Sequence, residues 1–234
     1  MTSQEKCFRG LQKTTLLDFP GKVACVLFVG GCSFNCPYCY NCSLVKREEP
    51  ELSWDAVWDF LAQRRKVLDG VCISGGEPTL APFLAEFLGE VKALGLEVKL
   101  DTNGYHPEPL RTLLDADLLD FVALDIKNSP AKYAATSGRT TIDLNRIRQS
   151  LDLVQASGVA HELRTTVAEG LHEVADMREI VAFTGGGARY SLQPVQRDAV
   201  SLSRQRFVPP TFTTLRAMGE ILEGSFSEVY IHGI

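Results

Sequence analysis

Short apolar segments recur along the chain, separated by stretches whose apolar residues follow a helical period. Seven such segments run over 23–29, 71–74, 98–100, 121–124, 163–167, 190–192 and 229–231. Alternating strand-like and helix-like segments are typical of a parallel α/β fold. Most of the seven are continuously apolar, as expected for strands covered on both faces. The pattern predicts a parallel sheet of about six or seven strands, too few for a closed eight-stranded barrel. The pattern is compatible with a partial barrel or with an open doubly wound sheet.

The helices between these strands are marked by their first and last residues. Trp54, Val57, Trp58 and Leu61 have the i, i+3, i+4, i+7 spacing of one helix face, and Ser53 is a suitable N-cap. Similar spacing runs over 84–91 and 144–154, and each stretch is followed by a glycine that can end a helix. We also expect a helix over 211–222, before the last strand.

Polar and glycine residues follow four consecutive predicted strands rather than precede them. These segments are Gly30-Gly31-Cys32, Gly75-Gly76-Glu77-Pro78, Asp101-Thr102-Asn103-Gly104 and Asp125-Ile126-Lys127. Any one of them could be an ordinary turn. In parallel α/β folds, however, ligands bind at the carboxyl ends of the strands. The four segments together predict one shared site at that edge of the sheet.

Composition and charge exclude few classes of function, but they indicate the cellular compartment. The net charge is −5, and the longest basic run is only residues 64–66, so a nucleic-acid partner is not indicated. Nowhere do about eighteen apolar residues run together, so no membrane span is expected. The first residues show no apolar segment of signal-peptide type. We therefore expect a cytoplasmic protein.

Four of the seven cysteines fall within residues 32–42, and this clustering indicates metal binding. An odd cysteine count in a chain without a secretion signal argues against a disulfide framework. A structural zinc site usually takes four ligands in paired arms, and the chain has no second arm. The spacing Cys32-x3-Cys36-x2-Cys39 also differs from the ferredoxin run. Three thiolates on one loop suit an iron–sulfur cubane in which one iron lacks a protein ligand.

The cysteine loop resembles the motif of the radical S-adenosylmethionine (SAM) superfamily, including the aromatic Tyr38 before the last cysteine. The resemblance implies a partial (β/α)6 TIM-like barrel with outer helices, and a [4Fe–4S] cluster on Cys32, Cys36 and Cys39 whose open iron binds SAM. The Gly75-Gly76-Glu77 segment is similar to the superfamily's SAM-binding segment, in which a carboxylate faces the SAM ammonium. We expect one such domain over 1–234, with an N-terminal extension (1–22), a barrel core (23–200) and a C-terminal helix and strand (201–234).

Later segments resemble the activases of glycyl radical enzymes. By this resemblance Asp101, Thr102 and Asp125 would hold a monovalent cation, Na⁺ or K⁺, beside the SAM carboxylate. Thr102, Asn103, Asp125, Lys127 and Arg164 would lie against SAM itself.

The stretch Thr15–Gly21 is similar to the segment before the first strand in the activating proteins of anaerobic ribonucleoside-triphosphate reductase. Two residues depart from that family. Tyr40 stands where histidine is usual, and Cys42 is additional to the three-cysteine motif.

Three functions remain open at this point. The first is an activase that takes a hydrogen atom from a glycine of a partner enzyme, with a flavodoxin or ferredoxin-type electron donor. We choose it because an incomplete barrel leaves an opening for a peptide and no extra domain is evident to close it. The second is a radical SAM enzyme acting on a small molecule. The third is a non-enzymatic iron–sulfur or zinc module.

Overall fold

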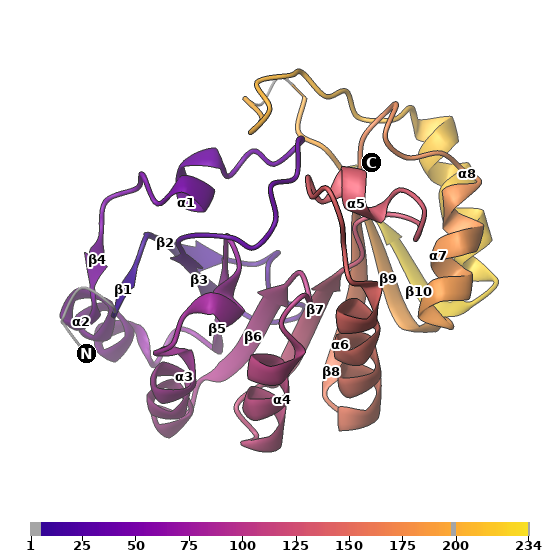
Figure 1. Ribbon diagram of the computed structural model, residues 1–234. Coiled ribbons are helices and arrows are strands. Elements are labelled where there is room, and N and C mark those ends of the chain that lie inside the picture. Colours follow the sequence, from indigo (N-terminus) through magenta and orange to yellow (C-terminus); the bar gives the residue numbers. More distant parts are fainter. Residues whose placement is uncertain (1–5, 198–199, 234) are drawn as a thin grey trace.

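The computed structural model describes residues 6–197 and 200–233. The first five residues of the expected N-terminal extension, positions 198–199 of the expected barrel core and residue 234 lie outside the described residues. The described chain forms one large curved sheet with helices along its outer face (Figure 1). A small second sheet pairs β1 (Cys7–Phe8) with β4 (Leu52–Ser53) in antiparallel fashion.

The large sheet has eight strands in the order β10-β9-β8-β7-β6-β5-β3-β2. All neighbouring strands are parallel except the pair β2–β3. The strands are β2 (Gly10–Thr15), β3 (Ala24–Val29), β5 (Gly70–Gly75), β6 (Glu97–Thr102), β7 (Phe121–Asp125), β8 (Ala160–Val167), β9 (Gly187–Pro194) and β10 (Phe226–Ile231).

Each of the seven apolar segments falls on a parallel strand, so the predicted α/β class with a parallel sheet is confirmed. Six of these strands lie within 23–200, and β10 adds a seventh parallel strand to the same sheet. The edge strand β2 was not predicted. Its residues are half-buried or exposed except Thr15, so it lacks the continuous apolar run that marks the inner strands.

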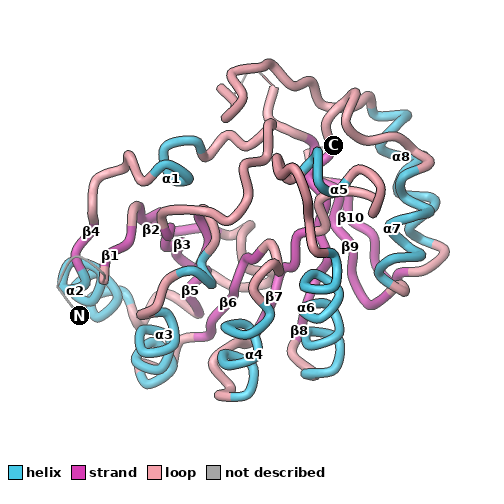
Figure 2. Tube along the Cα trace, in the orientation of Figure 1, coloured by secondary structure: helices cyan, strands magenta, loops and turns pink. Residues whose placement is uncertain are grey.

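Helices cover the outer face of the sheet, and the loops that follow the strands gather at its upper edge (Figure 2). The outer helices are α2 (Trp54–Arg64), α3 (Leu84–Ala93), α4 (Pro107–Asp115), α6 (Leu144–Ser157), α7 (Asp176–Thr184) and α8 (Phe212–Glu223). The short helices α1 (Cys42–Lys46) and α5 (Tyr133–Thr136) lie at the upper edge (Figure 1).

Helix limits follow the capping residues seen in the sequence. The hydroxyl of Ser53 accepts a hydrogen bond from the amide of Ala56 and so caps α2. Gly158 has the left-handed conformation that ends α6, and Thr211 caps α8. These helix limits can be predicted from the sequence because each cap involves only residues that are close in the chain.

Two apolar clusters divide the core. One lies under α2, α3 and α4 against β3, β5 and β6, and includes Leu27, Ile73 and Leu100. The other lies under α6, α7 and α8 and includes Leu124, Tyr190 and Met218. The cysteine loop leaves β3 in the first half but packs into the second cluster through Phe34, Cys36 and Tyr38. That loop therefore joins the two halves of the molecule. Within the described residues, no helix has the length and apolar character to cross a membrane.

Candidate active site

The cysteine loop begins where β3 and β5 end side by side, and glycines allow that close approach. A Cβ on Gly76 would lie 2.0 Å from the Gly31 carbonyl oxygen, and one on Gly75 would lie 2.3 Å from the Val29 carbonyl oxygen. Gly75 also has a φ of +122°, which L side chains rarely adopt. The amide of Glu77 donates to the Gly31 carbonyl at 2.8 Å. These contacts fix the start of the loop relative to the neighbouring strand.

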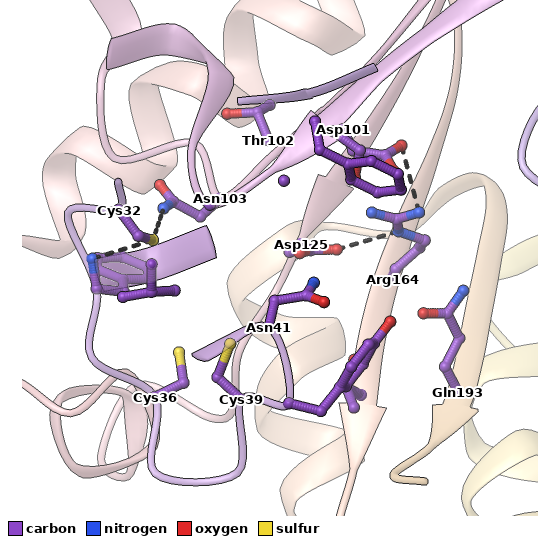
Figure 3. A pocket seen from close by; sticks show the side chains of 18 of the residues that line it. Cys32, Cys36, Cys39, Asn41, Asp101, Thr102, Asn103, Asp125, Arg164 and Gln193 are labelled. Carbon is purple, nitrogen blue, oxygen red and sulfur yellow. Dashed lines mark hydrogen bonds and ion pairs between the residues drawn. The ribbon is translucent and has the colours of Figure 1, made fainter. Parts of the chain in front are cut away.

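All three predicted cluster cysteines line one cavity at the carboxyl ends of the strands (Figure 3). The amide of Phe34 donates to the Cys32 sulfur at 3.4 Å, and the Asn103 side-chain amide approaches the same sulfur at 3.7 Å. Burial raises the pKa of Cys32 to about 12 and that of Cys36 to about 11, and it also raises the pKa of Cys39. Burial therefore disfavours free thiolates at these three positions.

Cys42, Cys25 and Cys72 do not line the cavity with the three predicted cluster cysteines. The Cys42 thiol donates to the carbonyl oxygens of Cys39 and Val200, at 3.3 Å and 3.4 Å. Cys25 and Cys72 are fully buried within their strands. Within the described chain, no three Cys, His, Asp or Glu side chains are arranged around a single metal ion.

Tyr38 forms the aromatic wall beside the cysteines. Its ring is buried and meets the rings of His172 and Phe207 edge to face, with centroids 6.3 Å apart in each case. The Tyr38 hydroxyl is buried and has no hydrogen-bond partner among the residues that the structure describes. Tyr38 is also one of the residues that line the cavity.

Opposite the cysteines, Arg164 joins two carboxylates from neighbouring strands (Figure 3). Its guanidinium lies 3.0 Å from Asp125 and 3.3 Å from Asp101. Lys127 donates to Asp125 at 2.9 Å, and the buried Lys99 donates to Asp101 at 2.5 Å. The strand ends of β6, β7 and β8 thus bring together five charged groups, of which Lys99 was not predicted.

The pKa values of these groups follow from burial and from their partners. Burial raises the pKa of Asp125, but the charges of Lys127 and Arg164 outweigh it and lower the pKa to about 2. For Asp101, burial is again outweighed by Arg164 and Lys99, and the pKa is lowered. Burial lowers the pKa values of Lys127 and Arg164, yet the carboxylates beside them raise both overall. All four groups are therefore charged at neutral pH.

Glu77 follows β5 and is enclosed by other residues of the strand ends. It is fully buried, and its carboxylate accepts hydrogen bonds from the Thr102 hydroxyl at 2.7 Å and the Asn103 amide at 2.8 Å. The hydroxyl and amide of Thr79 donate to it as well. Glu77 is not among the residues lining the cavity, and its expected contact with a ligand ammonium stays a prediction. Glu77 holds the ends of β5 and β6 together.

The cavity has a volume of ≈ 430 Å³ and is lined by all of the other predicted site residues. This size suits a small-molecule ligand. Sequence reasoning missed several of its lining residues, namely Gln12, Asp18, Tyr40, Asn41, Ser74, Thr166 and Gln193. Gln193 follows the apolar segment 190–192 on β9, so the rule that the site lies at strand ends would have found it.

The model of the radical SAM superfamily matches residues 26–186 of this chain. The chain belongs to the radical SAM superfamily. It is therefore an enzyme that uses a [4Fe–4S] cluster and SAM. The three thiols on one loop, and the cavity that they line together with Tyr38, fit these groups.

Relatives of this radical SAM enzyme carry several functions. It is 30% identical to "Putative glycyl-radical enzyme activating enzyme MJ1227" of Methanocaldococcus jannaschii, over 96% of this chain and 95% of the relative. It is also 30% identical to the PqqA peptide cyclase of Gluconobacter oxydans, over 67% of this chain and 44% of the cyclase. The structure of Streptococcus suis SuiB bound to its precursor peptide SuiA superposes with a TM-score of 0.67 at 16% identity, over 89% of this chain and 48% of SuiB. That last likeness supports the fold alone.

Proposed function

We propose that this radical SAM enzyme is an activase that generates a glycyl radical on a partner enzyme resembling anaerobic ribonucleotide reductase. The observation that carries the proposal is the match of nearly full length to a protein named as an activating enzyme. The peptide cyclase match, in contrast, covers less than half of the cyclase. The motif of residues 15–21 supports the ribonucleotide reductase class of partner.

Within this proposal, Cys32, Cys36 and Cys39 hold three irons of the cluster. Tyr38, Gly75, Gly76, Thr102 and Asn103, with the charged groups of β6, β7 and β8, would hold SAM beside the cysteine loop. When bound, the cluster and SAM supply a 5′-deoxyadenosyl radical that abstracts hydrogen from the substrate. Lys127 and Arg164 are the cationic groups that can receive the SAM carboxylate. Glu77 contributes by holding two walls of the cavity in place.

The open sheet gives a partner loop a route to the cavity. In the described part of the sheet, the edge strands β2 and β10 are not paired with each other. Residues of the edge region, Gln12 and Asp18, line the cavity together with Gln193 from β9. A glycine-bearing loop can therefore approach between the strand ends and the cysteine loop.

The experiment is anaerobic reconstitution of the cluster, followed by addition of SAM, a reductant and a candidate partner. A glycyl-radical doublet in the EPR spectrum of the partner is expected. The signal should vanish with Cys36→Ala and with a partner whose acceptor glycine is replaced by alanine. Cleavage of SAM that accelerates with a metabolite, but with no candidate partner protein, would contradict the activase proposal and support a small-molecule substrate.

The physiological setting follows from the same proposal. The cluster must receive one electron for each SAM cleaved, and a flavodoxin or ferredoxin-type protein is the proposed donor. We place this reaction in the cytoplasm. Fractionation of the native host, with the activase and its partner recovered in the same compartment, tests the assignment.

A further inference from the structure

Lys99 belongs to the charged group around Asp101 and Arg164, and it was not predicted as a site residue. It lies on β6 two residues before Asp101, so both side chains point to the same face of the sheet. Its neighbours Val98 and Leu100 point the other way, into the core beneath the helices. The Lys99 side chain is only 2% exposed. A lysine at this depth is rare and costly unless a partner neutralises it.

Asp101 is that partner. The Lys99 ammonium and the Arg164 guanidinium both contact the same carboxylate oxygen of Asp101. The Lys99 ammonium also lies 5.8 Å from the centre of the Phe121 ring, a cation–π arrangement. The small Ala123, opposite Asp101 on β7, leaves room for Arg164 to reach across from β8. Lys99 is therefore held in place by its surroundings.

Cationic side chains already surround Asp101, where a metal cation was expected to bind. Three cationic side chains, Lys99, Lys127 and Arg164, contact two carboxylates, Asp101 and Asp125. The nearest further carboxylate on β8 is Glu162, which accepts from the Ser191 hydroxyl at 2.9 Å. With Glu162 included, the three cationic and three carboxylate side chains of β6, β7 and β8 and of the turn after β7 balance, apart from Glu77, whose carboxylate is already held by four hydrogen bonds. An added metal cation would make this group of six side chains positive in a region of low dielectric, where charge is costly.

We propose that the Lys99 ammonium takes the place of a monovalent metal cation in this site, so that SAM binding depends on neither K⁺ nor Na⁺. This replaces the expectation that Asp101, Thr102 and Asp125 hold such an ion. The Thr102 hydroxyl is also engaged already, since it donates to Glu77 and accepts from the amide of Gly104. The proposal rests on the assignment of SAM to this cavity and not on the identity of the partner.

The test measures SAM binding by the reconstituted protein in buffers whose only cation is tetramethylammonium, with and without added K⁺ or Na⁺. For the unaltered protein, the dissociation constants should agree within about twofold. Lys99→Met should weaken SAM binding roughly tenfold without K⁺, and added K⁺ should restore most of it. Lys99→Arg keeps the charge and should remain independent of K⁺.

Lys92→Met is the matched control. It removes the same charge from a partly buried ion pair between α3 and Asp120, which directly precedes β7 and so lies at the end of the strand away from the site, and it should leave SAM binding unchanged. A loss of roughly tenfold in the unaltered protein on removing K⁺ and Na⁺ would overturn the proposal. So would a Lys99→Met protein that binds SAM normally in the metal-free buffer. If Lys99→Met does not fold, the unaltered protein and Lys99→Arg still decide the question. Because no partner takes part, these outcomes are independent of the activase proposal.

Discussion

Glu77 is a buried carboxylate that joins two strand ends of the site. Its oxygens accept from two hydroxyls and two amides, which ties the end of β5 to that of β6. Glu77→Gln replaces an accepting oxygen with an NH₂ group that faces donors. We expect the free energy of unfolding of the cluster-free protein to fall by about 1–3 kcal/mol. Urea unfolding measures this, and Glu86→Gln, an exposed carboxylate on α3, should change it by less than about 0.5 kcal/mol.

Asp125 should make stability depend on pH. Burial raises its pKa, but Lys127 and Arg164 lower the net value to about 2, below the ordinary value of about 3.9. Its contribution is therefore fully present above about pH 4 and is lost as the pH falls toward 2, by about 2 kcal/mol in all. Asp125→Asn should remove this part of the acid sensitivity. Urea midpoints at about pH 5 and about pH 3 test it, and an equal loss in both proteins would contradict the assignment.

Site residues could be predicted from the sequence where their signal is local. They could not be predicted where their role depends on contacts with residues distant in the sequence. Cys32, Cys36 and Cys39 were found because their spacing is local. Asp101 and Asp125 were found because each ends an apolar segment. The role of Glu77 could not be read from its motif, because its partner Thr102 is 25 positions away in the sequence. Lys99 escaped notice because a lysine inside an apolar segment has no signal of its own until Asp101 and Arg164 are placed around it.

At the scale of elements, the segment after residue 200 forms a strap across the cysteine loop. The amide of Leu202 donates to the Cys39 carbonyl at 2.8 Å, and that of Ser203 donates to the Pro37 carbonyl at 3.2 Å. Sequence reasoning assigned no chemistry to the segment after about residue 207 and saw no such contact before it. Backbone bonds between distant irregular segments leave no pattern in composition or periodicity. For the same reason the small sheet of β1 and β4 was not predicted.

The strap should protect the cluster without being needed for folding. Leu202→Pro removes the amide that bonds to Cys39, whereas Leu202→Ala shortens the side chain and keeps that amide. We expect the reconstituted Leu202→Pro protein to lose its visible cluster absorbance several times faster in the presence of a chelator. The Leu202→Ala protein should decay at a rate close to that of the unaltered protein. Equal decay in both variants would show that the backbone bond has no such role.

At the scale of the whole molecule, the cysteine loop is what connects the two halves of the core. It starts at β3, in the half covered by α2 and α3, yet Phe34 and Tyr38 pack with the apolar residues beneath α6, α7 and α8. The amide of Asn35 also donates to the Ser137 carbonyl, between α5 and α6, at 2.9 Å. A cluster bound to this loop fixes its conformation and so stabilises the contact between the halves.

Cluster binding should therefore raise the stability of the entire fold. A ligand that binds only the native state stabilises it by mass action, and metal binding to a loop of this kind adds directly to the folding free energy. We expect anaerobic calorimetry to show a higher Tm for the reconstituted protein, by about 2–4 °C for each kcal/mol of binding energy gained. Cys36→Ala should abolish the increase after the same treatment. A single transition that moves as a whole is expected, because the loop contacts both halves. If only part of the transition shifted, the loop would be stabilising one half alone.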